Sequence, residues 1–160
     1  GAGRALPLVG LFANQPVEEV DEVVARVGLD MVQLCGDEDD AYYAQMELPI
    51  LRQVRVRPET SPEDLEAEVH AHLEAGRMVL LDAYDPNVPG GAGKSFEWSK
   101  AANVASLEGV LLAGGLNPDN VVDAIQGLGA WGVDVSSGVE TDGDKDDVKI
   151  HNFVTEALSA

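Results

Sequence analysis

The chain has 160 residues, of which 45% are hydrophobic, enough for one domain spanning residues 1–160 with a buried core. Its formal net charge is −19, from 29 acidic and 10 basic residues, and this argues against nucleic-acid partners, which need clustered Lys and Arg. No apolar run approaches the ~20 residues of a membrane helix. No basic segment precedes an apolar stretch at the start, so neither a membrane partner nor a secretory signal is expected.

Cysteine use and charge fit a cytoplasmic protein. Cys35 is the only cysteine, so no internal disulfide is possible, as is usual in a reducing compartment. The acidic excess indicates either an ordinary solvated surface or adaptation to a salty cytoplasm. The first residue is Gly rather than Met, and we therefore expect the sequence to begin downstream of a natural start.

Strands and helices are predicted to alternate along the chain. Strands are predicted from short runs of β-branched and aliphatic residues, and helices from capping residues, first-turn acids and apolar residues at helical spacing. In chain order these are a strand at 8–12, a helix at 14–28, a strand at 31–34, a helix at 37–46, a strand at 49–56, a helix at 61–76, a strand at 78–82, a short helix at 96–101, a strand at 109–115, a helix at 117–129, a strand at 132–135 and a helix at 144–158. The last helix is predicted to turn Val148, Ile150, Phe153, Val154 and Leu158 inward.

This alternation predicts an α/β fold with a parallel sheet. The strands are apolar throughout, as in a parallel sheet that is covered on both faces. Two architectures fit the pattern: a doubly wound open sheet and a (β/α)8 barrel. The chain is short for a complete barrel, for which about 250 residues is typical.

Polar residues and glycines gather just after the predicted strands. They are Asn14 and Gln15, then Cys35 to Glu38, Arg55 and Arg57, Asp82, Gly114 and Gly115, and Ser136 to Gly138. In both parallel architectures the carboxyl ends of the strands carry the ligand site. The functional site is therefore expected at the edge of the sheet that the carboxyl ends of the strands form.

Two of these clusters predict a phosphate site. AGGLNPDN places Gly114 and Gly115 before a helix, and DVSSGVE places Ser136, Ser137 and Gly138 after the last strand. Backbone N–H groups at such turns, together with a helix N-terminus, favour phosphate oxygens. The alternative is that the glycines serve only the unusual backbone angles of the turns.

Several segments together resemble one enzyme family. VGLFANQPVEEV, MVQLCGDE, LLDAYDPNVPGGAGKSFEW, LLAGGLNPDNV and GVDVSSGVE resemble, in order, segments of phosphoribosylanthranilate isomerases of tryptophan biosynthesis, from about Leu8 to the end. The resemblance implies a (β/α)8 barrel, here an incomplete one formed by units three to eight, with the first two units missing. It implies no metal and no organic cofactor.

The resemblance also implies the chemistry. The family converts N-(5-phosphoribosyl)anthranilate into 1-(2-carboxyphenylamino)-1-deoxyribulose 5-phosphate by an Amadori rearrangement, which needs a general acid and a general base. By resemblance Asp82 is the acid, and its apolar strand would favour a protonated fraction near neutral pH. Without the family, a helix-capping or salt-bridged Asp would be preferred. The segment 85–93 is interpreted as a lid.

The general base is expected to be absent from the chain. The family supplies it as a cysteine at the end of its first strand, which these residues do not include. Cys35 stands where the family usually has histidine, so the base role is not transferred to it. A small, partly buried residue is the preferred interpretation of Cys35.

Other positions follow from the resemblance. Asp134 is expected to contact the substrate, and Gly114, Gly115, Ser136, Ser137 and Gly138 to bind its phosphate. Apart from the resemblance, Arg55 points along its strand toward the same end of the sheet and is expected to assist in binding substrate anions. The alternatives are a buried Asp134 bonded to backbone and an ordinary surface ion pair for Arg55. His70 and His72 are expected to be solvated, and Trp98 and Trp131 to pack in the core.

A second functional hypothesis remains open. In the first hypothesis the chain is an isomerase. In the second it lacks the general base and is an inactive fragment or a phosphate-binding subunit. A barrel lacking two units leaves open strand edges near 8–12 and 132–135, which invite pairing with another chain. A homo-oligomer or a complementing N-terminal segment is therefore an expected partner, beside the phosphoribosylated substrate.

Overall fold

The chain folds around a parallel β-sheet. The structure is a computed structural model that describes residues 6–83 and 98–160, apart from the side chain of residue 83. The strands of the sheet are β1 (Val9–Phe12), β2 (Met31–Leu34), β3 (Ile50–Val56), β4 (Met78–Ala83), β5 (Val110–Ala113) and β6 (Gly132–Val133). They lie in chain order from β1 to β6, and each neighbouring pair is parallel.

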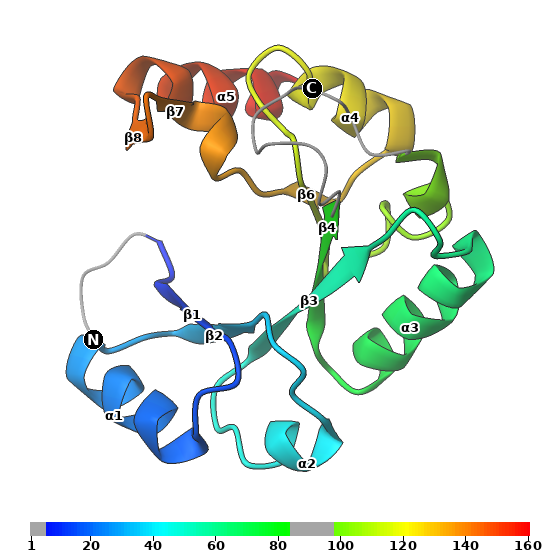
Figure 1. Cartoon of the computed structure of the whole chain (residues 1–160). Coiled ribbons are helices and arrows are strands. Elements are labelled where there is room, and N and C mark those ends of the chain that lie inside the picture. Colours follow the sequence, from blue (N-terminus) through cyan, green and yellow to red (C-terminus); the bar gives the residue numbers. More distant parts are fainter. Residues whose placement is uncertain (1–5, 84–97) are drawn as a thin grey trace.

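Helices connect the strands and cover one side of the sheet. They are α1 (Val17–Val27), α2 (Asp40–Tyr43), α3 (Pro62–Glu74), the 3-10 helix η1 (Trp98–Ala101), α4 (Val121–Leu128) and α5 (Asp147–Ser159). Figure 1 shows these helices on the outer side of a curved sheet. Within the described residues, every helix is too short or too polar to cross a membrane.

The strand order decides between the two architectures that the sequence allows. In a doubly wound sheet the order of the strands reverses part-way, whereas the strands of a (β/α)8 barrel follow the chain with the helices outside. Here the order runs from β1 to β6 without reversal, and these two strands form the edges of the sheet. The described part of the chain is therefore an incomplete barrel, as predicted.

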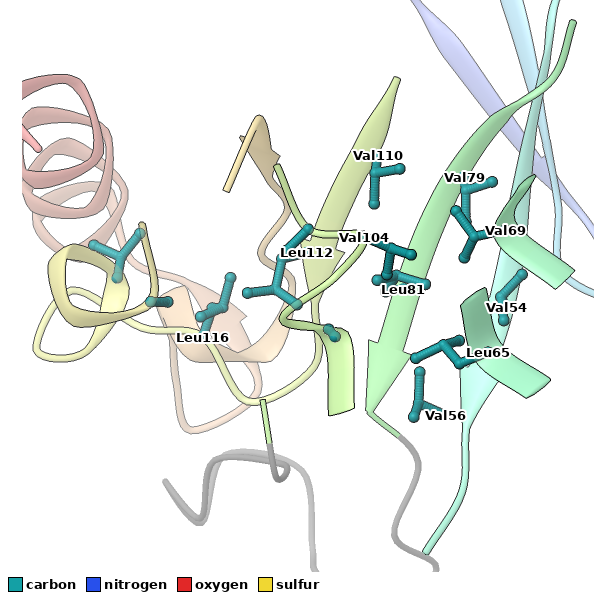
Figure 2. Close-up of a cluster of buried hydrophobic side chains, with 14 of the residues drawn as sticks. Val54, Val56, Leu65, Val69, Val79, Leu81, Val104, Val110, Leu112 and Leu116 are labelled. Carbon is teal, nitrogen blue, oxygen red and sulfur yellow. The ribbon is translucent and has the colours of Figure 1, made fainter. Parts of the chain in front are cut away.

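The main hydrophobic core lies between the outer face of the central strands and the helices. Val79 and Leu81 of β4 pack with Leu65 and Val69 of α3, and all four side chains are fully buried (Figure 2). Burial of an aliphatic side chain of this size contributes about 1.5–3 kcal/mol. Because successive side chains of a strand alternate between its faces, this packing turns Asp82 to the inner face.

The inner face begins with an apolar layer and becomes polar toward the carboxyl ends of the strands. Leu51 of β3, Leu80 of β4 and Ala113 of β5 form a small buried cluster there. One step further along the same strands, Gln53 and Asp82 are hydrogen-bonded to each other. The apolar layer thus lies directly beneath the polar side chains at the carboxyl ends of the strands.

Two helices differ in extent from the prediction. α2 covers only Asp40–Tyr43 instead of 37–46, and it begins after Asp39, whose side chain caps it by accepting from the Tyr42 amide. α4 begins at Val121 rather than at 117, since the Asn120 side chain accepts a hydrogen bond from the Asn117 amide at 2.8 Å and closes a turn there. Of the predicted helix 96–101, the described part is η1.

The predicted inward face of the last helix is wrong for most of its residues. Phe153 is buried, with 5% of its surface exposed. In contrast, Val148, Val154 and Leu158 are 67%, 48% and 84% exposed, and Ile150 is 37% exposed. Within the described residues, Phe153 and Ala157 are the side chains of this helix that pack against the main core.

Two aromatic side chains also lie elsewhere than predicted. Trp131, next to the edge strand β6, is 48% exposed instead of packed in the core. His72 is half-buried rather than solvated, because Arg77 Nε donates a hydrogen bond to its Nδ1 atom at 3.0 Å and the Tyr43 ring meets it edge-on. Trp98 packs against the main core as predicted.

Candidate functional site

Asp82 lies at the carboxyl end of β4 on the inner face of the sheet. Its Oδ2 atom accepts a hydrogen bond from Gln53 Nε2 of β3 at 2.5 Å. Burial raises the pKa of the Asp82 carboxyl above its usual value, although the hydrogen bond from Gln53 and the charge of Arg55 oppose this. The group therefore keeps a protonated fraction at a higher pH than an exposed aspartate does.

Asp134 supplies a second carboxyl to the same electrostatic environment. It follows β6 directly, and its amide donates to the Leu112 carbonyl of β5 at 2.9 Å. Burial raises the pKa of Asp134, the negative charge of Asp82 raises it further, and Lys145 lowers it. The charge of Asp82 therefore disfavours ionisation of Asp134 at the same end of the sheet.

The two glycine-rich turns meet at this edge. The Gly-Gly turn consists of Gly114 and Gly115, whose φ angles of 82° and 70° lie in the left-handed region that favours glycine. At Gly138 an added Cβ would lie 1.8 Å from the Leu116 carbonyl oxygen, so the backbones of the two turns are in direct contact there. The predicted phosphate residues are therefore neighbours in space.

Lys145 is a residue of this region that the sequence did not single out. It ends the small hairpin of β7 (Glu140–Thr141) and β8 (Asp144–Lys145), which folds back toward the turn after β6. Its Nζ atom donates to the Ser136 carbonyl at 2.9 Å and to Glu140 Oε1 at 2.7 Å. The hairpin thus places the Lys145 ammonium beside Ser136, with its charge paired to Glu140.

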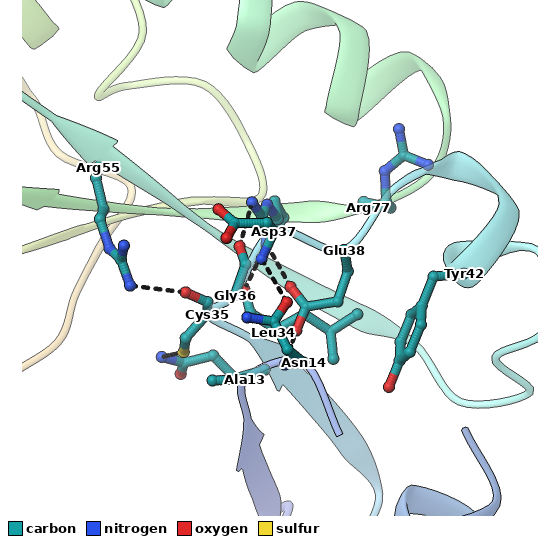
Figure 3. A network of polar contacts seen from close by, with 12 residues as sticks. Ala13, Asn14, Leu34, Cys35, Gly36, Asp37, Glu38, Tyr42, Arg55 and Arg77 are labelled. Carbon is teal, nitrogen blue, oxygen red and sulfur yellow. Dashed lines mark hydrogen bonds and ion pairs between the residues drawn. The ribbon is translucent and has the colours of Figure 1, made fainter. Parts of the chain in front are cut away.

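Cys35 follows β2 at the same edge, where a polar network surrounds it (Figure 3). Gln33 Nε2 donates to its sulfur at 3.4 Å, and Arg55 donates to its backbone carbonyl at 2.9 Å. Burial and the nearby Glu38 charge raise the pKa of the thiol, while the bond from Gln33 lowers it. A protonated thiol is a poor base, so these surroundings do not favour Cys35 as a general base.

Glu38 and Arg52 tie the loops after β1 and β2 together. The carboxylate of Glu38 is almost fully buried and forms an ion pair with Arg52 Nη1 at 2.8 Å. Glu38 Oε1 also accepts from the Asn14 amide at 2.8 Å, and Asn14 Oδ1 accepts from the Asp37 amide at 2.8 Å. Asn14, Asp37 and Glu38, which were predicted at this edge, therefore have structural partners within the loops.

Several predicted features stay untested or lie apart. Arg57 is exposed beyond β3, where its amide donates to Thr60 Oγ1. The segment 85–93, predicted as a lid, lies outside the described residues. Among the described residues, no cluster of three or more His, Cys, Asp or Glu side chains is arranged to hold a metal ion.

Comparison with known proteins identifies the family. The family model for N-(5'-phosphoribosyl)anthranilate (PRA) isomerase matches residues 2–156. The chain belongs to this family. The N-(5'-phosphoribosyl)anthranilate isomerase of Roseiflexus castenholzii is 43% identical over 162 residues, which cover 100% of this chain and 74% of that protein.

Solved structures of the isomerase family share the fold. Phosphoribosyl anthranilate isomerase from Thermotoga maritima has a TM-score of 0.82 and 32% identity, over 97% of this chain and 74% of that one. A family member in complex with reduced 1-(o-carboxyphenylamino)-1-deoxyribulose 5-phosphate has a TM-score of 0.77 and 30% identity, over 97% and 73%. The chain thus spans about three quarters of the length of these isomerases.

Proposed function

We propose that this chain carries the isomerase activity of its family, the Amadori rearrangement of N-(5-phosphoribosyl)anthranilate in tryptophan biosynthesis. The observation that carries the proposal is the juxtaposition of Asp82, Asp134 and the two glycine-rich turns at one edge of the sheet. A proton donor and an anion site at one opening match a substrate with a sugar ring and a phosphate. The family complex with a reduced product analogue supports this substrate class.

In the proposed mechanism Asp82 is the general acid. It gives its proton to the ring oxygen of the sugar as the bond from that oxygen to the anomeric carbon breaks. The lone pair of the anilino nitrogen forms a double bond to the anomeric carbon, which gives an open iminium ion. A base then takes the proton from the neighbouring carbon, which gives a neutral enaminol. Protonation of the former anomeric carbon and loss of the hydroxyl proton from the neighbouring carbon yield the aminoketose.

The substrate is held at both ends in this proposal. The Gly-Gly turn, Ser136, Ser137 and Gly138 bind its phosphate through backbone N–H groups and hydroxyls. Asp134 and Arg55 contact the remainder of the substrate beside Asp82. No base is assigned among the 160 residues, since Cys35 is their only cysteine and burial raises the pKa of its thiol.

The assembly and location of the chain are part of the proposal. Residues 1–160 form one partial barrel domain in the cytoplasm, which the single cysteine supports. β1 and β6 each pair with one neighbour only within the described sheet. These edges accept a second copy of the chain or an N-terminal segment that supplies further strands.

Turnover of the anthranilate phosphoriboside, followed by loss of its fluorescence, tests the proposed function. We expect Asp82→Asn to abolish turnover, because the amide cannot protonate the ring oxygen, and to leave affinity for the reduced product analogue within about threefold of wild type. Asp123→Asn, on the exposed face of α4, is the matched control and keeps the wild-type rate. Full activity of Asp82→Asn contradicts the acid assignment.

A chain without turnover separates two further outcomes. If the wild-type chain binds the product analogue but does not turn over the phosphoriboside, it is a phosphate-binding piece that needs the base from elsewhere. If it neither binds nor turns over, the proposed function is wrong for these residues.

A further inference from the structure

Gln53 is the side chain in direct contact with the proposed acid. It lies on the inner face of β3, half-buried, and its Nε2 atom donates to Asp82 Oδ2 at 2.5 Å. The sheet register places Gln53 beside Leu80 and Arg55 beside Asp82, so the glutamine reaches Asp82 diagonally along the neighbouring strand. This contact is an outcome of strand pairing and does not depend on a loop.

Among the described residues, the surroundings of Gln53 favour its contact with Asp82. Beneath it the inner face is closed by the buried Leu51, Leu80 and Ala113, so its amide cannot turn to solvent on that side. The other polar group of β3 at this level, Arg55, donates its hydrogen bond to the Cys35 carbonyl on the far side of the strand. The Asp82 carboxyl therefore receives a neutral donor instead of a guanidinium bond.

A neutral amide suits a carboxyl that must gain and lose a proton. Its NH₂ group donates to Oδ2 when the carboxylate is ionised, and it can keep this bond when the proton is on Oδ1. A lysine or arginine in the same place would stabilise the ionised form alone. With Oδ2 held by Gln53, the proton to be transferred is left to Oδ1.

We propose that Gln53 is a positioning residue that holds Oδ2 of Asp82 and presents Oδ1 to the sugar ring oxygen. The inference rests on the proposed function for its catalytic meaning, whereas the contact itself is independent of it. Gln53 and Arg55, both from β3, act on the ionisation of Asp82, and Asp82 in turn acts on Asp134 after β6. Gln53 differs from Arg55 because it bonds the Asp82 carboxyl directly and so also fixes its orientation.

The first test measures the ionisation of Asp82 without any need for turnover. The purified chain, with aspartate labelled by ¹³C at the side-chain carboxyl, is titrated by NMR, and the Asp82 resonance is assigned with Asp82→Asn. In Gln53→Met the lost donor leaves the ionised form less stable, so the Asp82 midpoint moves to higher pH. Gln53→Glu removes the donor and adds a negative charge, so its midpoint moves further in the same direction.

Gln45→Met is the matched control. Gln45 is exposed after α2, where its side chain donates to the Ala41 carbonyl. Its loss leaves the Asp82 midpoint at the wild-type value. If Gln53→Met and Gln53→Glu both keep the wild-type midpoint while their circular dichroism stays native, Gln53 does not act on Asp82 and the proposal is wrong.

A second test separates positioning from the proposed function. In the turnover assay we expect Gln53→Met to lower kcat by about tenfold or more with KM little changed, and to extend activity to higher pH. If the NMR midpoint shifts but Asp82→Asn keeps full turnover, the contact stands and the acid assignment falls. If Asp82→Asn is inactive but Gln53→Met keeps kcat and the wild-type midpoint, the positioning role falls and the proposed function stands.

Discussion

The acidity of Asp82 depends on a balance among a few groups. Burial raises its pKa, whereas the Gln53 hydrogen bond and the Arg55 charge lower it. A general acid must carry its proton when it reacts, so the rate is expected to fall as the pH rises past the Asp82 pKa. Because the net direction of this pKa is upward, the balance extends the active range toward neutral pH.

At the residue scale, Gly115 offers a direct test of the phosphate site. We expect Gly115→Val to weaken the affinity for the reduced product analogue by about tenfold or more, because a side chain on this turn crowds the bound phosphate. Isothermal titration calorimetry measures this affinity.

Gly76→Val is the control for backbone strain. Gly76 has a φ of 76°, close to the 70° of Gly115, and lies in an open position after α3. Both substitutions cost about 1–3 kcal/mol of folding stability for the left-handed backbone, but the Gly76 variant keeps the wild-type affinity. Equal affinities of the two variants would exclude the Gly-Gly turn from phosphate binding.

At the element scale, α2, α3 and the start of β4 are joined by three side chains. Arg77 stacks over the Tyr43 ring at 4.5 Å, and its Nε atom donates to His72 Nδ1. Burial and the charge of Arg77 lower the pKa of His72 to about 4. The imidazole is therefore neutral in the folded state over the physiological range, and it serves as an acceptor.

This histidine predicts a defined pH dependence of stability. An unfolded histidine takes up a proton near pH 6.5, whereas the folded His72 does so only near pH 4, so the wild-type protein loses stability as the pH falls through this window. His72→Gln keeps an acceptor for Arg77 but does not titrate. We expect the difference in unfolding free energy between wild type and His72→Gln to change in favour of the variant from pH 6.5 to 4, as measured by urea denaturation.

His70→Gln is the matched control, since His70 lies exposed on the same helix. Its stability is expected to follow the wild-type curve through the same pH window. A pH-independent difference between wild type and His72→Gln would mean that His72 is not held neutral.

The elements were largely predictable from the sequence because they depend on local patterns. Apolar runs gave all six strands of the sheet, and Asp82 was placed at the end of β4 by the residues before it. The contact of Gln53 with Asp82 was not predicted, because it depends on the register of β3 against β4. Lys145 was missed for a similar reason, since a hairpin turns it back toward Ser136.

The misjudged face of α5 shows the limit of periodicity. Helical spacing identifies Val148, Ile150, Val154 and Leu158 as apolar positions, but it does not say which neighbours are present to cover them. The same limit applies to Trp131. Its large apolar ring predicts a core position, but the residue is half exposed beside β6.

At the scale of the whole molecule, large apolar side chains are exposed on an edge strand and at the end of the last helix. Leu11 of the edge strand β1 is 66% exposed, and Leu158 at the end of α5 is 84% exposed. A strand edge with apolar side chains is a template for pairing with another chain. We therefore propose that the chain associates through the edge strand β1, which carries Leu11.

We expect the purified chain to associate as its concentration rises, with an apparent mass above the 16.9 kDa of one copy in sedimentation velocity experiments. Leu11→Lys places a charge on the edge strand and shifts this association to higher concentration. Val27→Lys, at the exposed end of α1, is the control and leaves it unchanged. A mass of one copy at every concentration up to about 0.5 mM contradicts the pairing of the open edges.

Titration of the ¹⁵N- and ¹³C-labelled chain with the reduced product analogue tests the central claim most directly, because it reports the acid and the phosphate turns together. The account predicts that the NMR resonances of the Gly115 and Gly138 amides and of the Asp82 carboxyl shift along one common binding curve. The amide resonance of Gly76, which lies before the amino end of β4, does not respond. Shifts at the two glycine-rich turns with an unchanged Asp82 carboxyl would contradict it.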